Sequence, residues 1–321
     1  MKIFKTLFAT ALITVLSFGC LSAQGISEAI ELYNSGLKAF HASEYAQAIV
    51  DIEKALKIAA NEEDEQAAEL RINAEKLLPR LYFDYGRQQI NNKMHTEGLA
   101  TLNKAKEIAE KLGDDTVMAS LHELMPQVYT IIGQADTEAG RHTEGIANFR
   151  KALEFDKTNS TIYLRLGLAQ EQAKDEEGAI ATFNHIVTME GAKPADVANA
   201  NRRLGTIFLR RAAAGQQTRN WTSVFDNAKK SVEHDNANMQ AQRLLGAAAL
   251  ELKRWDDAIN AFEAVLASNP AATDKNTTIY RLAMAYEGKG NRAKACANYR
   301  LIVSDPQFKA FAESKVRALC Q

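Results

Sequence analysis

Three arginines are the residues of this chain best suited to hold a ligand. Arg202 and Arg210 are eight positions apart, so on a helix they lie about two turns apart along one face. Arg243 adds a third guanidinium group further along the chain. Guanidinium groups can hold a carboxylate through two parallel hydrogen bonds. These residues predict a site for an acidic partner, and a solvated arginine face is the alternative.

Motifs for catalysis and for metal binding are missing from the sequence. It contains no GxGxxG, GxxxxGK[ST], HExxH, CxxC or GxSxG pattern. The six histidines have no partners at the spacing of metal ligands. We therefore expect no enzyme activity, no cofactor and no metal. The net charge of −1 also argues against a nucleic-acid or anionic-membrane binder, because both favour a basic excess.

The beginning of the chain has the pattern of a secretory signal. Lys2 and Lys5 precede an apolar stretch at residues 7–18, and small residues follow it. The stretch is too short to span a membrane. We expect residues 1–23 to be a signal peptide, so that the mature chain begins at Gln24.

A lipid anchor on Cys20 is the alternative for this segment. Gly19 directly before the cysteine favours a lipoprotein signal. Ser17 disfavours it, because lipoprotein signals usually carry leucine at that position. Membrane association is expected only if Cys20 is lipidated.

Two cysteines near the end of the chain are a candidate disulfide. If Cys20 leaves with the signal, Cys296 and Cys320 remain, and an even count in an exported chain favours a bond. Such a bond would contribute about 3 kcal/mol, judged by the length of the loop that it closes. Two buried free thiols are the alternative.

A fixed spacing of small and bulky residues recurs along the chain. A small residue is followed twelve positions later by another, and a bulky apolar residue comes four positions after that. The sets are Gly36, Ala48, Ile52; Gly86, Gly98, Leu102; Gly133, Gly145, Phe149; Gly167, Ala179, Phe183; Gly246, Ala258, Phe262; and Ala283, Ala295, Tyr299. A single globular core does not need this regularity, whereas a stack of helical hairpins does. We expect the bulky residues to fill the gap to the next hairpin.

The sequence resembles the tetratricopeptide repeat (TPR) family over nearly everything after Gln24. The pattern of that family is present as Tyr163, Leu166, Gly167, Ala179 and Phe183, and again as Leu245, Gly246, Ala258, Phe262 and Pro270. The resemblance implies an all-α solenoid of about seven helical hairpins at residues 24–321, wound as a right-handed superhelix. The repeats begin near Ala29, Pro79, Pro126, Ser160, Ala198, Met239 and Asn276, and a capping helix is expected at residues 306–321.

Three places depart from a regular repeat. Residues 62–78 and 114–125 have helical periodicity and predict lengthened first helices in the second and third repeats. Pro79 and Pro126 should kink or restart these helices. Residues 212–221 predict an inserted edge loop in the fifth repeat, which is either a contact site or a tolerated insertion.

The resemblance implies that the first helix of each repeat lines a concave groove that binds peptides. Carried over residue by residue, the partner-binding positions are Tyr33, Leu37, Phe40, Phe83, Arg87, Arg202, Thr206, Arg210 and Arg243, with Asn91, Leu164, Leu168 and Glu171 on the same face. The first half is apolar and suits an apolar peptide face. The middle is cationic, and Arg243 has the same position in its repeat as Arg202. A subset of the family clamps peptide C-termini with Lys and Asn, but Thr206 replaces that Asn, which puts such a clamp in doubt.

These observations predict an exported, non-catalytic scaffold whose partner is a protein or peptide, acidic in character at the arginines. We expect it in the periplasm or at the outer membrane of a Gram-negative bacterium, and overall resemblance suggests a Bacteroidetes-like member. One alternative is a lipid-anchored accessory subunit of an outer-membrane assembly. A second is a small anionic-ligand binder or enzyme that uses the arginine-rich groove.

Overall fold

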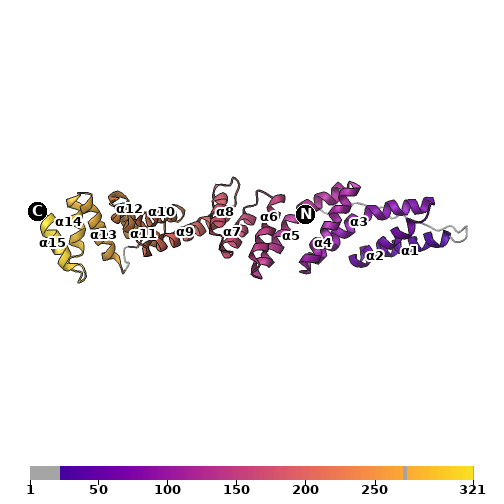
Figure 1. The fold of residues 1–321 in the computed structure, drawn as a ribbon, viewed down its shortest axis with the longest axis horizontal. Coiled ribbons are helices and arrows are strands. Elements are labelled where there is room, and N and C mark those ends of the chain that lie inside the picture. Colours follow the sequence, from indigo (N-terminus) through magenta and orange to yellow (C-terminus); the bar gives the residue numbers. More distant parts are fainter. Residues whose placement is uncertain (1–21, 270–272, 321) are drawn as a thin grey trace. The chain divides into compact units, whose positions relative to one another are not determined.

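The protein is built from α-helices throughout the part of the chain that is described. The computed structural model describes residues 22–269 and 273–320, and no residue in these ranges forms a β-strand. Figure 1 shows the fifteen helices of these ranges, which are α1 (Ser22–His41), α2 (Tyr45–Ala59), α3 (Glu65–Asn91), α4 (His95–Leu112), α5 (Asp115–Glu138), α6 (His142–Phe155), α7 (Ser160–Gln172), α8 (Glu176–Thr188), α9 (Pro194–Gln217), α10 (Trp221–His234), α11 (Met239–Glu251), α12 (Trp255–Ser268), α13 (Lys275–Gly288), α14 (Arg292–Leu301) and α15 (Lys309–Leu319). The expected all-α class is confirmed.

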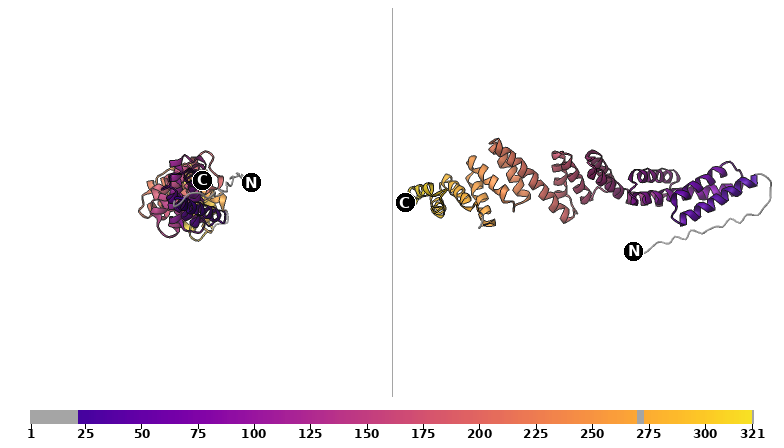
Figure 2. Two further views of the ribbon diagram at one scale, coloured as in Figure 1. Left: turned by 90° about the vertical axis from the view of Figure 1, so that its right-hand side faces the viewer. Right: turned by 90° about the horizontal axis from the view of Figure 1, so that it is seen from below.

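The chain divides into two compact units. The first ends at Ile132 and the second begins at Gly133, within α5. Inside each unit the helices pair as consecutive hairpins, and each hairpin packs on the next (Figure 2). Seven hairpins follow one another in the described chain, from α1/α2 to α13/α14, and α15 packs on α14 to close the series. This is the stacked-hairpin arrangement that the repeats predict.

Small residues on the first helix of a hairpin receive a bulky side chain from its second helix. A Cβ atom added to Gly36 would lie 2.8 Å from Cδ1 of Ile52, and one added to Gly167 would lie 2.5 Å from Cε1 of Phe183. Ile52 and Phe183 are fully buried, as close packing of this kind requires. The bulky residues were expected to fill the gap to the next hairpin. Phe183 does so as well, because it shares a buried cluster with Leu204 of α9.

Every corner between the two helices of a hairpin contains one residue in the left-handed conformation. These residues have φ between 55° and 81° and lie two positions before the second helix begins; they are Ser43, Lys93, Gly140, Lys174, Arg219, Lys253 and Gly290. The residue after each one donates its backbone N–H to the carbonyl five positions back, as Glu44 does to Ala39 at 2.9 Å. This closes the first helix in the manner of a Schellman motif.

Pro79 and Pro126 do not interrupt their helices. The lengthened first helices are confirmed, since α3 has 27 residues and α5 has 24, with the proline inside each. A proline removes one hydrogen bond from a helix interior. Around Pro79 the buried side chains of Leu78 and Leu81 pack in the core, and this packing offsets the lost bond. Of the two expected outcomes, the restart is therefore wrong, and a kink at either proline stays a prediction.

The insertion in the fifth repeat is helical, which corrects the expected edge loop. Helix α9 continues to Gln217, and α10 begins at Trp221. The inserted residues that extend α9, 212–217, are three Ala, one Gly and two Gln, and Ala and Gln favour helices. Ala212 is fully buried in the core cluster of the second unit, so tertiary packing holds the added turns as helix.

The capping helix is shorter than expected and is joined to α14 by a disulfide. It begins at Lys309, and the bond links Cys296 to Cys320, whose Cα atoms are 5.4 Å apart. Phe308, just before this helix, is buried. Phe311 remains 41% exposed, although its ring makes an edge-to-face contact with that of Tyr280.

The segment expected to be a signal peptide lies mostly outside the described residues, as does Cys20. Across residues 22–269 and 273–320, no helix combines the length and the apolar character that a membrane span requires.

Candidate protein-binding face

The first helices of neighbouring hairpins contact one another directly. These contacts join α1 to α3 in the first unit, and α7 to α9, α9 to α11 and α11 to α13 in the second. All residues expected to bind a partner lie on these helices. We call the surface that they form the A-helix face, and describe it separately for each unit.

In the first unit, the apolar residues of the A-helix face lie partly in the core. Tyr33 and Phe40 are half-buried and pack against the buried cluster of the unit, and Leu37 is half-buried too. Burial raises the pKa of the Tyr33 hydroxyl. The ring of Phe40 lies 6.0 Å from that of Tyr45, at the start of α2. These side chains offer an aromatic edge rather than a broad apolar surface.

Phe83 differs from its expected role, because it is only 6% exposed. The guanidinium carbons of Arg80 and Arg87 lie 5.5 and 6.0 Å from the centre of its ring. A cation over an aromatic face is attracted by the ring quadrupole. A partner at this position would therefore contact the two arginines rather than the ring of Phe83.

A buried carboxylate that the sequence reading missed holds both arginines. Asp84 is 4% exposed; its Oδ2 accepts from Nε of Arg80 at 2.7 Å, and its Oδ1 lies 3.2 Å from Nη2 of Arg87. A buried charge needs such compensation. One carboxylate beside two guanidinium groups leaves this spot with a net positive charge.

A shallow hollow of about 300 Å³ adjoins this group. It is lined by Ser43, Tyr45, Asp84, Arg87, Gln88 and Asn91. Gln88 donates to the backbone carbonyl of Ser43 at 3.2 Å, so the first two hairpins are tied together at its rim. Of the residues expected here, Arg87 and Asn91 reach the hollow.

In the second unit, Arg202 is the arginine most available to a partner. It is exposed, and the only hydrogen-bond partner of its guanidinium group in the described chain is the side-chain oxygen of Asn199, one turn earlier. Thr206 is exposed as well, but its hydroxyl donates to the carbonyl of Arg202 at 2.9 Å. Thr206 therefore offers a partner mainly an acceptor.

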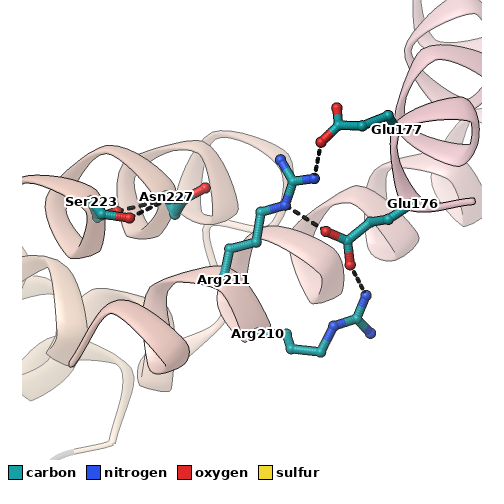
Figure 3. A network of polar contacts seen from close by, with 6 residues as sticks. All are labelled: Glu176, Glu177, Arg210, Arg211, Ser223 and Asn227. Carbon is teal, nitrogen blue, oxygen red and sulfur yellow. Dashed lines mark hydrogen bonds and ion pairs between the residues drawn. The ribbon is translucent and has the colours of Figure 1, made fainter. Parts of the chain in front are cut away.

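Arg210 is already paired with a carboxylate of the preceding hairpin. Figure 3 shows Glu176 between Arg210 and Arg211, with Glu177 on the far side of Arg211. Nε of Arg211 lies 2.6 Å from Glu176. The hydrogen bond from Arg210, followed by that from Arg211, holds the pKa of the Glu176 carboxyl below its usual value against the opposing effect of burial.

Glu171 brings a partly buried carboxylate to the same region. Its nearest cation is Arg203, at 3.5 Å, and its Oε2 accepts no hydrogen bond from the described residues. Burial raises the pKa of this carboxyl, although Arg203 and Arg210 act in the opposite direction. The surface around α9 thus mixes acidic and basic groups.

Arg243 is the third arginine of the expected patch, and it too has an internal partner. Its Nη2 donates to Oδ1 of Asp274 at 2.8 Å, just before α13. Two of the three arginines are therefore ion-paired within the protein, Arg210 with Glu176 and Arg243 with Asp274. In the described chain, histidine, cysteine and acidic side chains nowhere gather in groups of three suited to a metal ion.

Comparison with protein families finds tetratricopeptide repeats in three hairpins. Two family models described as tetratricopeptide repeat match the chain, one at residues 240–272 and 277–307 and the other at residues 126–159. These segments correspond to the sixth, seventh and third hairpins. The family resemblance drawn from the sequence is supported there. No curated protein matches the chain.

Several solved structures are similar to the chain at low TM-score. The crystal structure of MamA protein has 21% identity over 59% of this chain and 95% of its own, with a TM-score of 0.35. YrrB, titled a TPR protein with an unusual peptide-binding site, has 18% identity over 58% of this chain and 91% of its own, with a TM-score of 0.32. The complex of the TPR2AB domain of yeast Sti1 with pHSP90 has 15% identity over 92% of this chain and 99% of its own, with a TM-score of 0.39. At these values the likeness carries no inference about what this chain binds.

Proposed function

We propose that this chain, three of whose hairpins match the tetratricopeptide repeat, is an exported and non-catalytic scaffold that binds a protein or peptide on its A-helix face. The observation that carries the proposal is the direct contact between successive first helices, which makes their outer side chains one surface within each unit. A surface that extends over several hairpins suits a ligand of several residues better than a small molecule.

The exposed arginines of this surface favour an acidic partner. Arg87 is anchored by a buried carboxylate, and Arg202 has no carboxylate partner in the described chain. An arginine held in place loses less side-chain freedom when it binds a carboxylate. The anchored Arg87 and the unpaired Arg202 are therefore the two strongest contact points for acidic side chains.

A peptide array tests this role. The purified chain is probed with acidic, neutral and basic peptides, and the best binders are measured again with Arg87→Ala and Arg202→Ala. We expect acidic peptides to bind and each substitution to weaken binding about tenfold, which corresponds to about 1.4 kcal/mol. Arg150→Ala, an exposed arginine on α6, is the matched control and should leave binding unchanged. Binding that favours basic peptides, or that ignores both face substitutions, would contradict the proposal.

The proposal of export depends on the residues before Gln24. One measurement distinguishes a cleaved signal peptide from a lipid anchor on Cys20. The mass of the mature N-terminus from the native host should show a chain that begins at Gln24. The Gly19–Cys20 pair supports the second candidate, a lipid-anchored accessory subunit of an outer-membrane assembly. An acylated Cys20 at the N-terminus would favour that form, and an uncleaved Met1 would exclude both.

A further inference from the structure

The last three helices carry a strong excess of basic residues. Residues 275–320 contain nine Lys and Arg against three Asp and Glu, a net charge of +6. Two of these cations are paired with carboxylates, Lys289 with Asp256 and Lys315 with Glu287. The other seven have no carboxylate partner in the described chain. Arg292 donates to the carbonyl of Ala318 and Lys294 to the hydroxyl of Tyr286. The remaining five are Lys275, Arg281, Arg300, Lys309 and Arg317. We call residues 275–320 the basic end.

Exposed apolar side chains accompany these charges. Met284 on α13, Leu301 on α14 and Phe311 on α15 are 39%, 65% and 41% exposed. The described part of residues 133–274 has no large apolar side chain that is comparably exposed. Exposed apolar groups rimmed by charge are typical of surfaces that meet another protein.

The first unit has the opposite charge. Residues 22–132 contain eighteen Asp and Glu against eleven Lys and Arg, a net charge of −7, whereas residues 133–274 have a net charge of −2 from seventeen against nineteen. The excess of negative charge in the first unit is greatest at residues 62–69, which contain five carboxylates and no cation. Arg71, the next cation, donates to the backbone carbonyls of Ala59 and Glu62 rather than to a carboxylate. We call residues 62–69 the acidic corner.

The acidic corner also has an exposed apolar neighbour. Ile72, one turn further along α3, is 52% exposed, and Glu63, Glu65 and Glu69 are exposed around it. Ile72 is the most exposed of the large apolar side chains of the first unit, which also include Val50, Met94, Leu112 and Ile131. The two surfaces are complementary in charge and alike in carrying apolar groups.

We propose that the basic end of one copy of this chain docks on the acidic corner of a second copy. The occupant is a second copy because the chain itself supplies the surface that complements the basic end. A contact between two different surfaces of identical chains is head-to-tail, so it continues from copy to copy into an open chain or a ring. Exposed ion pairs are individually weak and are screened by salt, so the association depends on several pairs together and on ionic strength.

Sedimentation velocity of the purified protein at about 20 mM and about 500 mM NaCl tests this contact. We expect species larger than a dimer to grow with protein concentration at low salt and to dissociate to monomers at high salt. Reversing the basic end with R300E, K309E and R317E, or the acidic corner with E63K, E65K and E69K, should each weaken association at least tenfold. The matched control, R150E, K157E and K229E, makes the same charge change on exposed residues that lie outside both segments in the sequence and should leave association intact.

Mixing the two reversed variants provides the decisive outcome. Each fails to associate alone, but together they place oppositely charged surfaces on different chains, so association should return. Circular dichroism checks that each variant remains helical.

The proposal is overturned if the natural chain stays monomeric at low salt, if the control weakens association as much as R300E/K309E/R317E does, or if mixing does not restore association. A monomeric chain that binds vesicles of anionic phosphatidylglycerol would assign the basic end to a membrane surface and would also overturn it. None of these outcomes depends on peptide binding by the A-helix face.

Discussion

The buried carboxylate of Asp84 lies 3.2 Å from the guanidinium group of Arg87, one helical turn away. The same carboxylate accepts from Arg80 at 2.7 Å, so one acidic group positions two half-exposed cations on the A-helix face. Neither contact depends on a second helix. The positioning is therefore built into α3 itself.

Asp84→Asn should loosen both arginines and lower the stability of the first unit. The amide cannot compensate two guanidinium groups, and a buried polar group that loses its partners costs about 1–3 kcal/mol. Urea unfolding followed by circular dichroism measures the loss. Glu75→Gln, at an exposed position of the same helix, is the control and should change stability by less than about 0.5 kcal/mol. Equal stability of the natural chain and Asp84→Asn would show that the carboxylate does not hold the arginines.

The contact between Gly167 and Phe183 should respond sharply to one added methyl group. A Cβ at position 167 would lie 2.5 Å from the ring, so Gly167→Ala forces the ring to move and should cost about 1–3 kcal/mol. Phe183→Leu makes room for the methyl group, at its own cost. In a double-mutant cycle the combined loss should fall short of the sum of the single losses by more than about 0.5 kcal/mol. Strict additivity would mean that the two residues do not share the space.

At the left-handed corners, adding a side chain and removing one should have opposite effects on stability. A Cβ at Gly290 meets no atom within 4 Å, so Gly290→Ala should destabilise only through its φ of 81°, by about 1 kcal/mol. Lys174 already has a side chain at φ 62°, so Lys174→Gly should relieve strain and raise stability by up to about 1 kcal/mol. Thermal unfolding of both variants checks the signs. The same sign for both would contradict this account of the corners.

His234 should make the second unit less stable in mild acid. Burial lowers the pKa of its imidazole below the usual 6.5, while the nearby Glu233 acts in the opposite direction. The ring stacks on Phe208 at 5.9 Å, and its Nδ1 lies 2.9 Å from the side-chain oxygen of Asn201. As the pH falls below 6.5, the unfolded chain takes up the proton first, so stability is lost toward the folded pKa.

Urea midpoints at about pH 7.5 and about pH 5.5 measure this effect. His234→Gln should have a smaller drop between the two values than the natural chain. His41→Gln, an exposed histidine of the first unit, serves as control and should keep the full drop. A drop that His234→Gln leaves unaltered would assign the acid sensitivity to other groups.

The disulfide should hold the capping helix on the last hairpin. It closes a loop of 24 residues, for which about 3 kcal/mol of stabilisation is expected. Cys320→Ser should therefore lower the unfolding midpoint and expose α15 to proteolysis. Reductant should bring the natural chain to the level of the variant and leave the variant itself unaffected. Two free thiols in the denatured, unreduced chain would show that the bond does not form.

Much of the architecture could be predicted because it follows from residue spacing. Gly36, Gly167 and Gly246 mark first helices, and the bulky residue sixteen positions later reports the helix that packs on each. The secondary structure of the insertion at residues 212–221 could not be predicted in this way. Whether a run of Ala and Gln becomes loop or helix depends on what buries Ala212, and the repeat pattern does not contain that neighbour.

The candidate site was less predictable than the fold for a related reason. The repeat pattern predicted the helices that carry Arg210 and Arg243, but it did not predict the partners of these arginines. Those partners, Glu176 and Asp274, lie in adjoining hairpins, 34 and 31 positions away. A search for opposite charges one repeat length apart would have found both pairs. Asp84 had a signal of its own, an acidic residue four positions after one arginine and three before another.

The pairing of Arg210 with Glu176 makes recognition at α9 an exchange rather than a simple addition. A ligand carboxylate that pairs with Arg210 has to displace Glu176. Glu176 then keeps only its ion pair with Arg211. The affinity measured for such a ligand is therefore the difference between two similar interactions, and its arrival loosens the junction between α8 and α9. Ligand binding at this part of the surface would therefore change the mobility of the α7/α8 hairpin.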